Sequence, residues 1–366
     1  MKYGILCLLA ALVAPADISL QQDGNRGLAT ATSEAALRQD TTAPLFESHE
    51  VLQLTLEAPL SDVIMERSQE SSEYPGVLSY GTASGERVAL DIEVKTRGKK
   101  RLDRNTCDFP PLRLDVEETK VANTLFANQD KLKLVTHCMG RQAYEQYVLL
   151  EYLAYRVYNL LTDFSFKVRL AHITYVNTKQ PEDSLTKIAF LIENENRMAE
   201  RLGWEVLQFP QLHPDYMEEV ELSLLEVFQF MIGNTDWDAF FPEPDKEDCC
   251  HNTVPIGSMA VVYSVPYDFD FAGIIAPPYA VPSERLPIRS VRERLYRGVC
   301  RPDEELARTL AVFNEQKEAI YALYQNEPLL EDSYRERTME YLDGFYEIID
   351  DPGKVRREII SKCRGV

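Results

Sequence analysis

The sequence predicts an α+β protein whose first half is rich in β-strands and contains one helix, and whose second half is mostly helical. Three observations predict this order. Apolar and polar residues alternate in short runs up to about residue 135, which is typical of strands with one buried face. Residues 141–161 then follow helical spacing. From about residue 214 helical spacing dominates, and Pro302, Pro328 and Pro352 divide the last helices.

The strands expected in the first half belong to one antiparallel sheet. Structure should begin near Phe46, and turn-rich segments such as YGTASGE separate the alternating runs. Two further strands are expected over residues 166–176 and 187–193, joined by the turn-like NTKQPEDS. The four alternating runs are Leu52–Leu56, Val88–Val94, Leu112–Val116 and Leu132–Leu134.

The helix predicted over residues 141–161 carries a carboxylate, Glu151, in an otherwise aromatic stripe. An unpaired carboxylate is costly there, so a cationic partner is expected. Lys133, on the preceding strand, is the candidate partner. A strand lysine paired with a helix glutamate is how several phosphotransferases position the phosphates of ATP. Glu145 is the alternative partner for the lysine.

The N-terminal sequence predicts export. Residues 1–16 contain Lys2, a short apolar run and small residues suited to cleavage, as in a secretory signal peptide, and residues 17–45 are polar and aperiodic, as in a flexible linker. A lipid anchor at Cys7 is the alternative. No later apolar run approaches the roughly 20 residues of a membrane span, so no integral membrane contact is expected. A secreted or periplasmic location follows.

Six cysteines remain after the predicted signal peptide, which favours disulfides in an exported chain. Their pairing cannot be read from the sequence. Cys107 with Cys138, and Cys300 with one of the adjacent Cys249 and Cys250, are the suggested pairs, with the adjacent cysteines bonded to different partners. Zinc binding by Cys249, Cys250 and the following histidine is disfavoured, because structural zinc sites usually separate their cysteines by two to four residues.

The formal net charge of −20 makes nucleic acid a poor candidate partner, because phosphate backbones would be repelled. An anionic ligand would need local cations or a metal. One basic stretch, RSVRERLYRGVC, contains Arg289, Arg292 and Arg297. These arginines either contact an acidic substrate or phosphate, or belong to a stretch that lies on the surface or pairs internally with acidic neighbours.

The acidic stretch GNTDWDAFFPEPDKEDCCHN follows a buried helix predicted over residues 214–232. It presents Asp236 at the start of a loop that closes with Asn252. A strand then leads to PYDFDFAG, in which Asp268 and Asp270 lie two positions apart. This order is typical of phosphoryl-transfer sites, where the first aspartate accepts a hydroxyl proton and the other oxygen ligands hold Mg²⁺.

The segments GNTDW and HN, followed by VPYDFDFAG, resemble the catalytic region of the spore coat protein H (CotH) family of atypical kinases. Two upstream segments are also similar to that family. KTRG resembles its RG motif, and AFLIEN resembles its strand that ends in a glutamate before the linker to the helical lobe. The resemblance spans roughly residues 46–300.

The resemblance implies a two-lobed protein-kinase-like fold, with a β-rich lobe over residues 46–195 and a helical lobe over residues 196–366. It implies Mg²⁺-dependent transfer of phosphate from ATP to an acceptor hydroxyl, with a protein as the expected acceptor. Asp236 would be the catalytic base. The implied metal ligands are Asn252, Asp268 and Asp270, and the implied nucleotide-binding residues are Lys133, Glu151, Arg97 and Glu193.

Two departures from the kinase pattern bear on this hypothesis. Asn252 lies sixteen positions after Asp236, where kinase catalytic loops have about five, so AFFPEPDKEDCC is interpreted as an insertion. If the insertion displaced Asn252, metal binding would fail. There is also no GxGxxG phosphate loop, so Arg97, the lysines and backbone amides would contact the phosphates. The alternative function is a catalytically inactive module that binds a nucleotide, a glycan or a partner protein.

Two other kinds of site are disfavoured. A calcium site in DWDAFFPEPDKED would lack the glycine and the regular ligand spacing of calcium loops. A Ser-His-Asp hydrolase is disfavoured because the sequence has no GxSxG. His251 is the histidine nearest the proposed site, and it is interpreted as a structural residue that orients Asp236 or the loop backbone.

Overall fold

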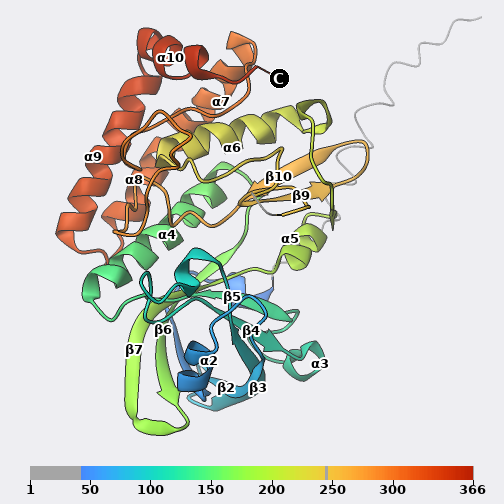
Figure 1. Ribbon diagram of the computed structural model, residues 1–366, viewed down its shortest axis with the longest axis vertical. Helices are drawn as coiled ribbons and strands as arrows, with labels where there is room; N and C mark the ends of the chain where they lie inside the picture. The colour runs from blue at the N-terminus through green and yellow to red at the C-terminus, as the bar shows by residue number, and fades with distance from the viewer. Residues whose placement is uncertain (1–42, 244–245, 366) are drawn as a thin grey trace, which may run out of the picture. The chain divides into compact units, whose positions relative to one another are not determined.

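Seven strands of the first half close into a β-barrel in the order β1-β2-β3-β4-β5-β7-β6. The structure is a computed structural model and describes residues 43–243 and 246–365 (Figure 1). The strands are β1 (Leu52–Ala58), β2 (Tyr74–Gly81), β3 (Arg87–Thr96), β4 (Leu112–Val116), β5 (Lys131–Val135), β6 (Val168–Asn177) and β7 (Gln180–Ile192). The short helices α2 (Leu60–Met65) and α3 (Glu118–Val121) and the 3-10 turns Pro44–Phe46 and Lys100–Leu102 lie between or before them.

The barrel overturns the predicted two-lobed protein-kinase-like fold, which is wrong. That prediction implied a β-sheet lobe followed by a helical lobe, whereas the first half is a closed barrel and the second half mixes helices with a sheet of its own. Closure depends on the parallel pairing of β1 with β6, from Leu52 opposite Ala171 to Ala58 opposite Asn177. Alternation along a strand shows which face is buried but not which distant strand lies beside it.

The barrel interior is filled by the apolar residues that the alternation identified. Leu54 and Leu56 of β1, Leu112 and Leu114 of β4, and Leu132 of β5 belong to one buried cluster. The expected antiparallel order is confirmed for every pair except β1 with β6. Strand β2 was not predicted, because Pro75 and Gly76 interrupt its pattern.

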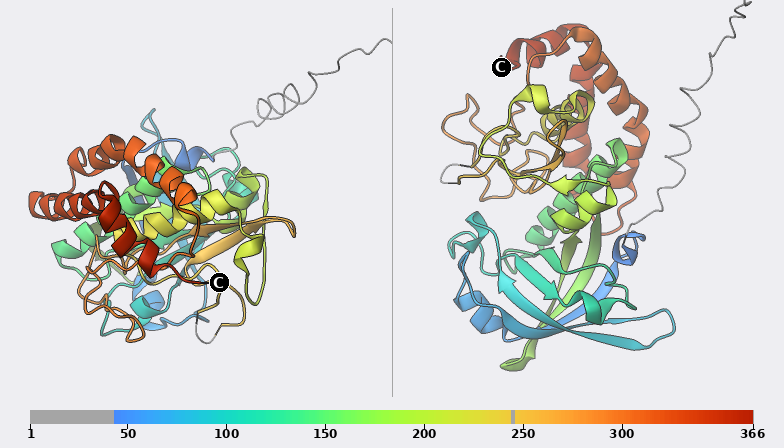
Figure 2. Two further views of the ribbon diagram at one scale, coloured as in Figure 1. Left: turned by 90° about the horizontal axis from the view of Figure 1, so that it is seen from above. Right: turned by 90° about the vertical axis from the view of Figure 1, so that its right-hand side faces the viewer.

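Helix α4 (Gln142–Leu161) packs against both halves of the molecule. It contacts strands β6 and β7 of the barrel on one side and helices of the second half on the other (Figures 1 and 2). Its predicted position is confirmed, and thirteen of its twenty residues are buried. This burial explains why its polar residues, including Glu151, must have partners inside the protein.

The second half consists of a three-stranded sheet and a set of helices. The sheet has the order β10-β9-β8. The elements are α5 (Glu195–Arg201), β8 (Glu205–Val206), a 3-10 turn (Pro214–Tyr216), α6 (Glu219–Ile232), β9 (Thr253–Gly257), β10 (Val262–Pro266), α7 (Asp303–Glu315), α8 (Lys317–Gln325), α9 (Asp332–Ile349), α10 (Pro352–Glu358) and a 3-10 turn (Ile360–Lys362). Helix α6 is buried on nearly every side, as its sequence predicted.

Three cysteine pairs lie at disulfide distance: Cys107–Cys138, Cys249–Cys250 and Cys300–Cys363. The first pair confirms its prediction. The pairing of Cys300 with one of the adjacent cysteines is wrong, because Val299 and Arg364 pair as a β-bridge that brings Cys300 to Cys363. The adjacent cysteines bond to each other and not to different partners, so neither is a free thiol for zinc.

The described residues contain three disulfides, which suit an extracellular protein. No helix within residues 43–243 and 246–365 is long and apolar enough to cross a membrane. The predicted signal peptide and residues 17–42 of the predicted linker lie outside the described residues.

Candidate functional site

Helix α6 delivers Asp236 to the site through a tight C-terminal cap. Gly233 ends the helix with φ +67°, and a Cβ there would come within 2.0 Å of the Tyr341 hydroxyl, so glycine is required. The Asn234 side chain then accepts a hydrogen bond from the Asp236 backbone N–H at 3.0 Å. The turn fixes the start of the loop, while the Asp236 side chain stays 42% exposed.

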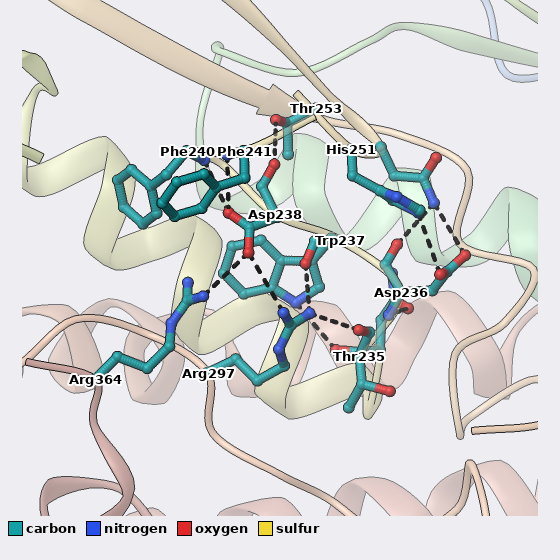
Figure 3. Close-up of polar contacts among 12 residues, drawn as sticks. Thr235, Asp236, Trp237, Asp238, Phe240, Phe241, His251, Thr253, Arg297 and Arg364 are labelled. Atoms are coloured by element: carbon teal, nitrogen blue, oxygen red, sulfur yellow. Dashed lines mark hydrogen bonds and ion pairs between the residues drawn. The ribbon is translucent and has the colours of Figure 1, made fainter. Parts of the chain in front are cut away.

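The insertion after Asp236 folds back, so that Asn252 lies beside it. Asp238 and His251 form an antiparallel bridge that closes the loop between them. Asn252 Nδ2 donates to the Asp236 backbone oxygen at 2.7 Å and to its Oδ2 at 3.2 Å. His251 Nε2 lies 3.2 Å from Asp236 Oδ1 (Figure 3). The insertion therefore does not displace Asn252.

His251 interacts electrostatically with Asp236. Burial opposes the charged imidazolium, but the hydrogen bond and the negative charge of Asp236 outweigh it and raise the pKa of His251 above its ordinary value. His251 therefore orients the Asp236 carboxylate and partly balances its charge. This arrangement agrees with the structural interpretation of His251 from the sequence.

Two arginines hold the start of the loop, Arg297 through backbone carbonyls and Arg364 through the Asp238 side chain. Arg297 Nη1 donates to the Thr235 backbone oxygen at 2.6 Å and also to that of Trp237. Asp238 Oδ2 accepts from Arg297 at 3.4 Å and from Arg364 at 3.1 Å (Figure 3). Of the two alternatives for the basic stretch, internal pairing therefore describes Arg297.

The hairpin of β9 and β10 brings Asn252 and Asp268 to the same end of a sheet. Thr253 pairs with Pro266, so Asn252 precedes one strand where Asp268 follows the other, and the Tyr267 N–H donates to the Asn252 backbone oxygen at 3.0 Å. Both residues have left-handed backbones, with φ +52° at Asn252 and +60° at Asp268. Such strain persists where surrounding structure enforces it, commonly at functional sites.

Helix α4 supports Asp268 directly. Tyr155 accepts a hydrogen bond at its hydroxyl oxygen from the Asp268 backbone N–H at 2.8 Å. Tyr155 and Glu151 lie one helical turn apart, so they face the same region. Glu151 and Tyr155 of the predicted aromatic stripe therefore face the site.

Asp236, Asn252 and Asp268 line one cleft of about 620 Å³ together with the basic segment that follows β3. Although the chain is strongly acidic, seven Lys or Arg residues and four Asp or Glu residues line this cleft. The lining cations are Lys95, Arg97, Lys99, Lys100, Arg101, Arg113 and Lys246. Such a local excess of positive charge favours an anionic ligand.

Arg97 has an unsatisfied donor in this cleft. Its Nη1 atom is buried and makes no hydrogen bond. A buried guanidinium donor without a partner is costly, because desolvation is not repaid. Arg97 as a residue lines the cleft, and phosphate oxygens are strong bidentate acceptors for an arginine guanidinium.

Arg101 makes the densest set of ion pairs in the site, and the sequence did not single it out. Its Nη2 lies 3.5 Å from Asp268 Oδ1, its Nε 3.3 Å from Asp270 Oδ2, and its Nη1 3.8 Å from Glu151 Oε2. Burial raises the pKa of both Glu151 and Asp270, and the positive charge of Arg101 opposes both shifts.

No family model, curated protein or solved structure matches this chain. The resemblance to the CotH family therefore stays a prediction.

Lys133 does not pair with Glu151, which corrects the predicted ion pair. Lys133 Nζ lies 3.0 Å from Glu195 Oε2 and 4.8 Å from the ring centre of Tyr267. The cause is register, because Lys133 lies opposite Ile192 at the end of β7, three residues before Glu195. Burial lowers the pKa of Lys133, and Glu195 opposes that shift. The alternative carboxylate, Glu145, pairs with Lys187 at 2.7 Å.

Glu193 is engaged inside the protein, away from the cleft lining. Its side chain is 3% exposed and accepts from Arg201 Nε at 2.9 Å and from the Lys167 backbone N–H at 3.0 Å. These contacts join the end of β7 to α5. The cleft therefore contains Arg97 of the four predicted nucleotide-binding residues, together with Asp236, Asn252, Asp268 and Asp270.

Within the part of the chain that the structure describes, no three His, Cys, Asp or Glu side chains form a metal-binding group. Asn252 and Asp268 both line the cleft and carry side-chain oxygens, the kind of donor that Mg²⁺ prefers. Chemically, the site can bind phosphates through cations and offers a partly exposed carboxylate, Asp236, to an acceptor.

Proposed function

We propose that this protein is an ATP-dependent phosphotransferase that transfers a phosphoryl group to a hydroxyl of an acceptor protein. Asp236 is the general base that accepts the hydroxyl proton. Arg97 and the neighbouring lysines bind the phosphates. The observation that carries the proposal is the single cleft in which Asp236, Asn252 and Asp268 meet the basic segment from Lys95 to Arg101.

The base is positioned before any substrate arrives. His251 and Asn252 each contact one carboxylate oxygen of Asp236, and each oxygen keeps further acceptor capacity for a substrate hydroxyl. Arg297 holds the backbone next to it, and Arg364 holds the side chain of Asp238. Positioning of this kind supplies much of the rate enhancement in phosphoryl transfer, because the reaction demands little covalent chemistry from the protein.

Asn252 and Asp268 fit a divalent cation. The Asn252 amide directs its Nδ2 to Asp236, so its Oδ1 is the opposite, metal-competent end of the group. Asp268 is 35% exposed at the side chain, so its carboxylate is accessible. A bound Mg²⁺ would supply neutralisation of the charge on the phosphate oxygens.

An inactive binding module is the second candidate function. It is favoured by Arg101, which already pairs with Asp268 and Asp270 and thus competes with a metal ion for them. Such a module would bind the nucleotide without transferring phosphate. The predicted secretion also favours the inactive module over an ATP-dependent enzyme, because ATP is scarce outside the cytoplasm in many settings.

The two candidates are separated by measuring binding and transfer on the same variants. Thermal unfolding of the wild type with ATP, with and without Mg²⁺, reports binding, and transfer from radiolabelled ATP to the protein itself or to a generic acceptor protein reports catalysis. Asp236→Ala should keep stabilisation by ATP and lose transfer, and Asp268→Ala should lose the Mg²⁺-dependent part of both. Asp248→Ala is the matched control, because Asp248 is exposed on the same loop and does not line the cleft.

Each outcome has a distinct meaning. Stabilisation without transfer in the wild type would favour the binding module. No stabilisation by ATP under either condition would refute both nucleotide proposals. Transfer that survives in Asp236→Ala would show that another group is the base.

A further inference from the structure

Arg101 joins three segments of the chain through its guanidinium. It lies in the 3-10 turn Lys100–Leu102, and the carboxylates it contacts come from helix α4 and from the segment after β10. Its side chain is 7% exposed. A buried guanidinium is stable only where carboxylates compensate its charge, and buried carboxylates likewise need a cation beside them.

The three carboxylates differ in their access to solvent. The side chains of Glu151 and Asp270 are 2% and 8% exposed, whereas that of Asp268 is 35% exposed. Asp270 Oδ2 also accepts a hydrogen bond from the Tyr279 hydroxyl at 3.1 Å. Arg101, Asp268 and Asp270 all line the cleft, but Asp268 is the most exposed of the three carboxylates, and Glu151 is enclosed behind them.

We infer that Arg101 is a fixed counter-cation that removes Glu151 and Asp270 from metal binding and leaves Asp268 and Asn252 as the protein ligands of the divalent cation. This inference rests on the proposed function. A divalent cation on the nearly buried Asp270 would lie against the guanidinium, and like charges repel strongly in a buried site. Asp268 pairs with Arg101 through Oδ1 but is 35% exposed, so solvent screens the repulsion there. Asp270, predicted from the sequence as a metal ligand, is instead part of the support of Asp268.

With Asn252 and Asp268 as its two protein ligands, the divalent cation depends on the nucleotide for its retention. Two protein oxygens are too few to hold Mg²⁺ firmly, so the phosphates of the nucleotide must complete its shell. The cation then binds with the nucleotide and not before it. Removal of Arg101 has the opposite effect, because Asp268, Asp270 and Glu151 lose their shared counter-cation and are free to turn toward a divalent cation without nucleotide.

The test uses Mn²⁺ alone, without nucleotide, on the full chain. Thermal unfolding is followed across a Mn²⁺ titration for the wild type, Arg101→Gln and Arg101→Gln/Asp270→Asn. Arg101→Gln should unfold at a lower temperature than the wild type without metal, yet be stabilised at Mn²⁺ concentrations about tenfold or more lower. The second substitution should abolish that gain. Arg104→Gln, at an exposed arginine in the same segment, should behave as the wild type.

A purely structural arginine would lower the unfolding temperature without any gain in Mn²⁺ binding, and that result would overturn the inference. If Arg101→Gln does not fold, the wild type and Asp270→Asn decide. Equal responses to Mn²⁺ support the inference, and a weaker response in Asp270→Asn overturns it. Because no ATP is present, failure of the nucleotide experiments would leave this result interpretable.

Discussion

Asn252 donates a hydrogen bond from Nδ2 to the backbone oxygen of Asp236 at 2.7 Å, although sixteen positions separate the two residues in the chain. The bridge between Asp238 and His251 makes this contact possible, because it returns the insertion to its starting point. Loops tolerate such added length at modest entropic cost. The contact thus brings the proposed base and a proposed metal ligand together.

The first prediction concerns this contact. Asn252→Ala removes both hydrogen bonds to Asp236 and one proposed metal ligand, so transfer should fall by about tenfold or more. Amide hydrogen exchange across residues 237–243 and 246–251 should become faster, because the closing end of the loop is released. Glu247→Ala, an exposed change in the same loop, is the control. Unchanged exchange in Asn252→Ala would show that the bridge alone holds the loop.

The second prediction concerns the loop anchor. Arg297→Met leaves the carbonyls of Thr235 and Trp237 without their donor, which should cost about 1–3 kcal/mol of unfolding free energy. Because the anchor positions Asp236 and does not touch the nucleotide, kcat should fall more than the KM for ATP rises. Arg289→Met, at an exposed arginine in the same basic stretch, should leave both values near those of the wild type. A rise in KM alone would contradict a positioning role.

The individual elements were readable from the sequence, and their partners were not. Alternation predicted β1, β3, β4 and β5, and helical spacing predicted α4 and α6, because each pattern depends on neighbours a few residues apart. Closure of the barrel depends on the parallel pairing of β1 with β6, which leaves no local signal. The predicted kinase-like fold failed at this point.

In the site, too, individual residues could be predicted from the sequence, but not all of their partners. The order of Asp236, Asn252 and Asp268 pointed to the residues that line the cleft. The partner of Glu151 was missed, because Arg101 lies in a short turn with no periodic pattern and Lys133 was the nearer candidate in the predicted strands. The expectation that a carboxylate in an aromatic stripe has a cationic partner was correct. That expectation was the sequence signal for the missed partner, Arg101.

A third prediction uses the pH dependence of stability. His137 is 2% exposed, packs against Phe109 at 4.8 Å between ring centres, and has a buried Nδ1 without a hydrogen bond. Burial lowers the pKa of His137 to about 4. Above pH 6.5 the ring is neutral in the folded and unfolded states. As the pH falls from 6.5 to 4, the unfolded chain takes up the proton first, so stability is lost over that range.

The measurement compares unfolding free energies of the wild type and His137→Phe across this range. As the pH falls, the wild type should lose unfolding free energy that His137→Phe keeps. This pH-dependent part of the difference should reach roughly 3 kcal/mol at pH 4, because one pKa unit corresponds to 1.36 kcal/mol. Parallel curves for the two proteins would show that His137 takes up its proton in the folded state near its ordinary pKa.

A fourth prediction concerns the disulfide between Cys300 and Cys363, which spans 63 positions. Replacing both cysteines with serine should lower the unfolding free energy by about 4 kcal/mol, from the loop entropy of the unfolded chain. The bond also secures the strand-like contact from which Arg364 reaches Asp238. Urea unfolding measures the loss, and a loss of under about 1 kcal/mol would contradict a stabilising disulfide here.

The fifth prediction asks which cation binds the phosphates. Lys133 is already paired with Glu195 at 3.0 Å, whereas Arg97 lines the cleft with a buried Nη1 that has no hydrogen-bond partner. A group that is unsatisfied in the free protein gains most from a phosphate, because no existing bond must be broken. Arg97→Gln should therefore weaken ATP binding by about tenfold to a hundredfold, as expected for a lost hydrogen bond to a charged group. Lys133→Met should weaken it less.

Arg87→Gln is the matched control, because Arg87 begins the strand that Arg97 follows and is exposed. Affinities from isothermal titration with ATP and Mg²⁺ give the comparison, and hydrogen exchange of β3 and β5 checks that the barrel is intact in each variant. A larger loss for Lys133→Met than for Arg97→Gln would mean that ATP binding breaks the pair of Lys133 with Glu195. The lysine, and not the arginine, would then be the principal phosphate ligand.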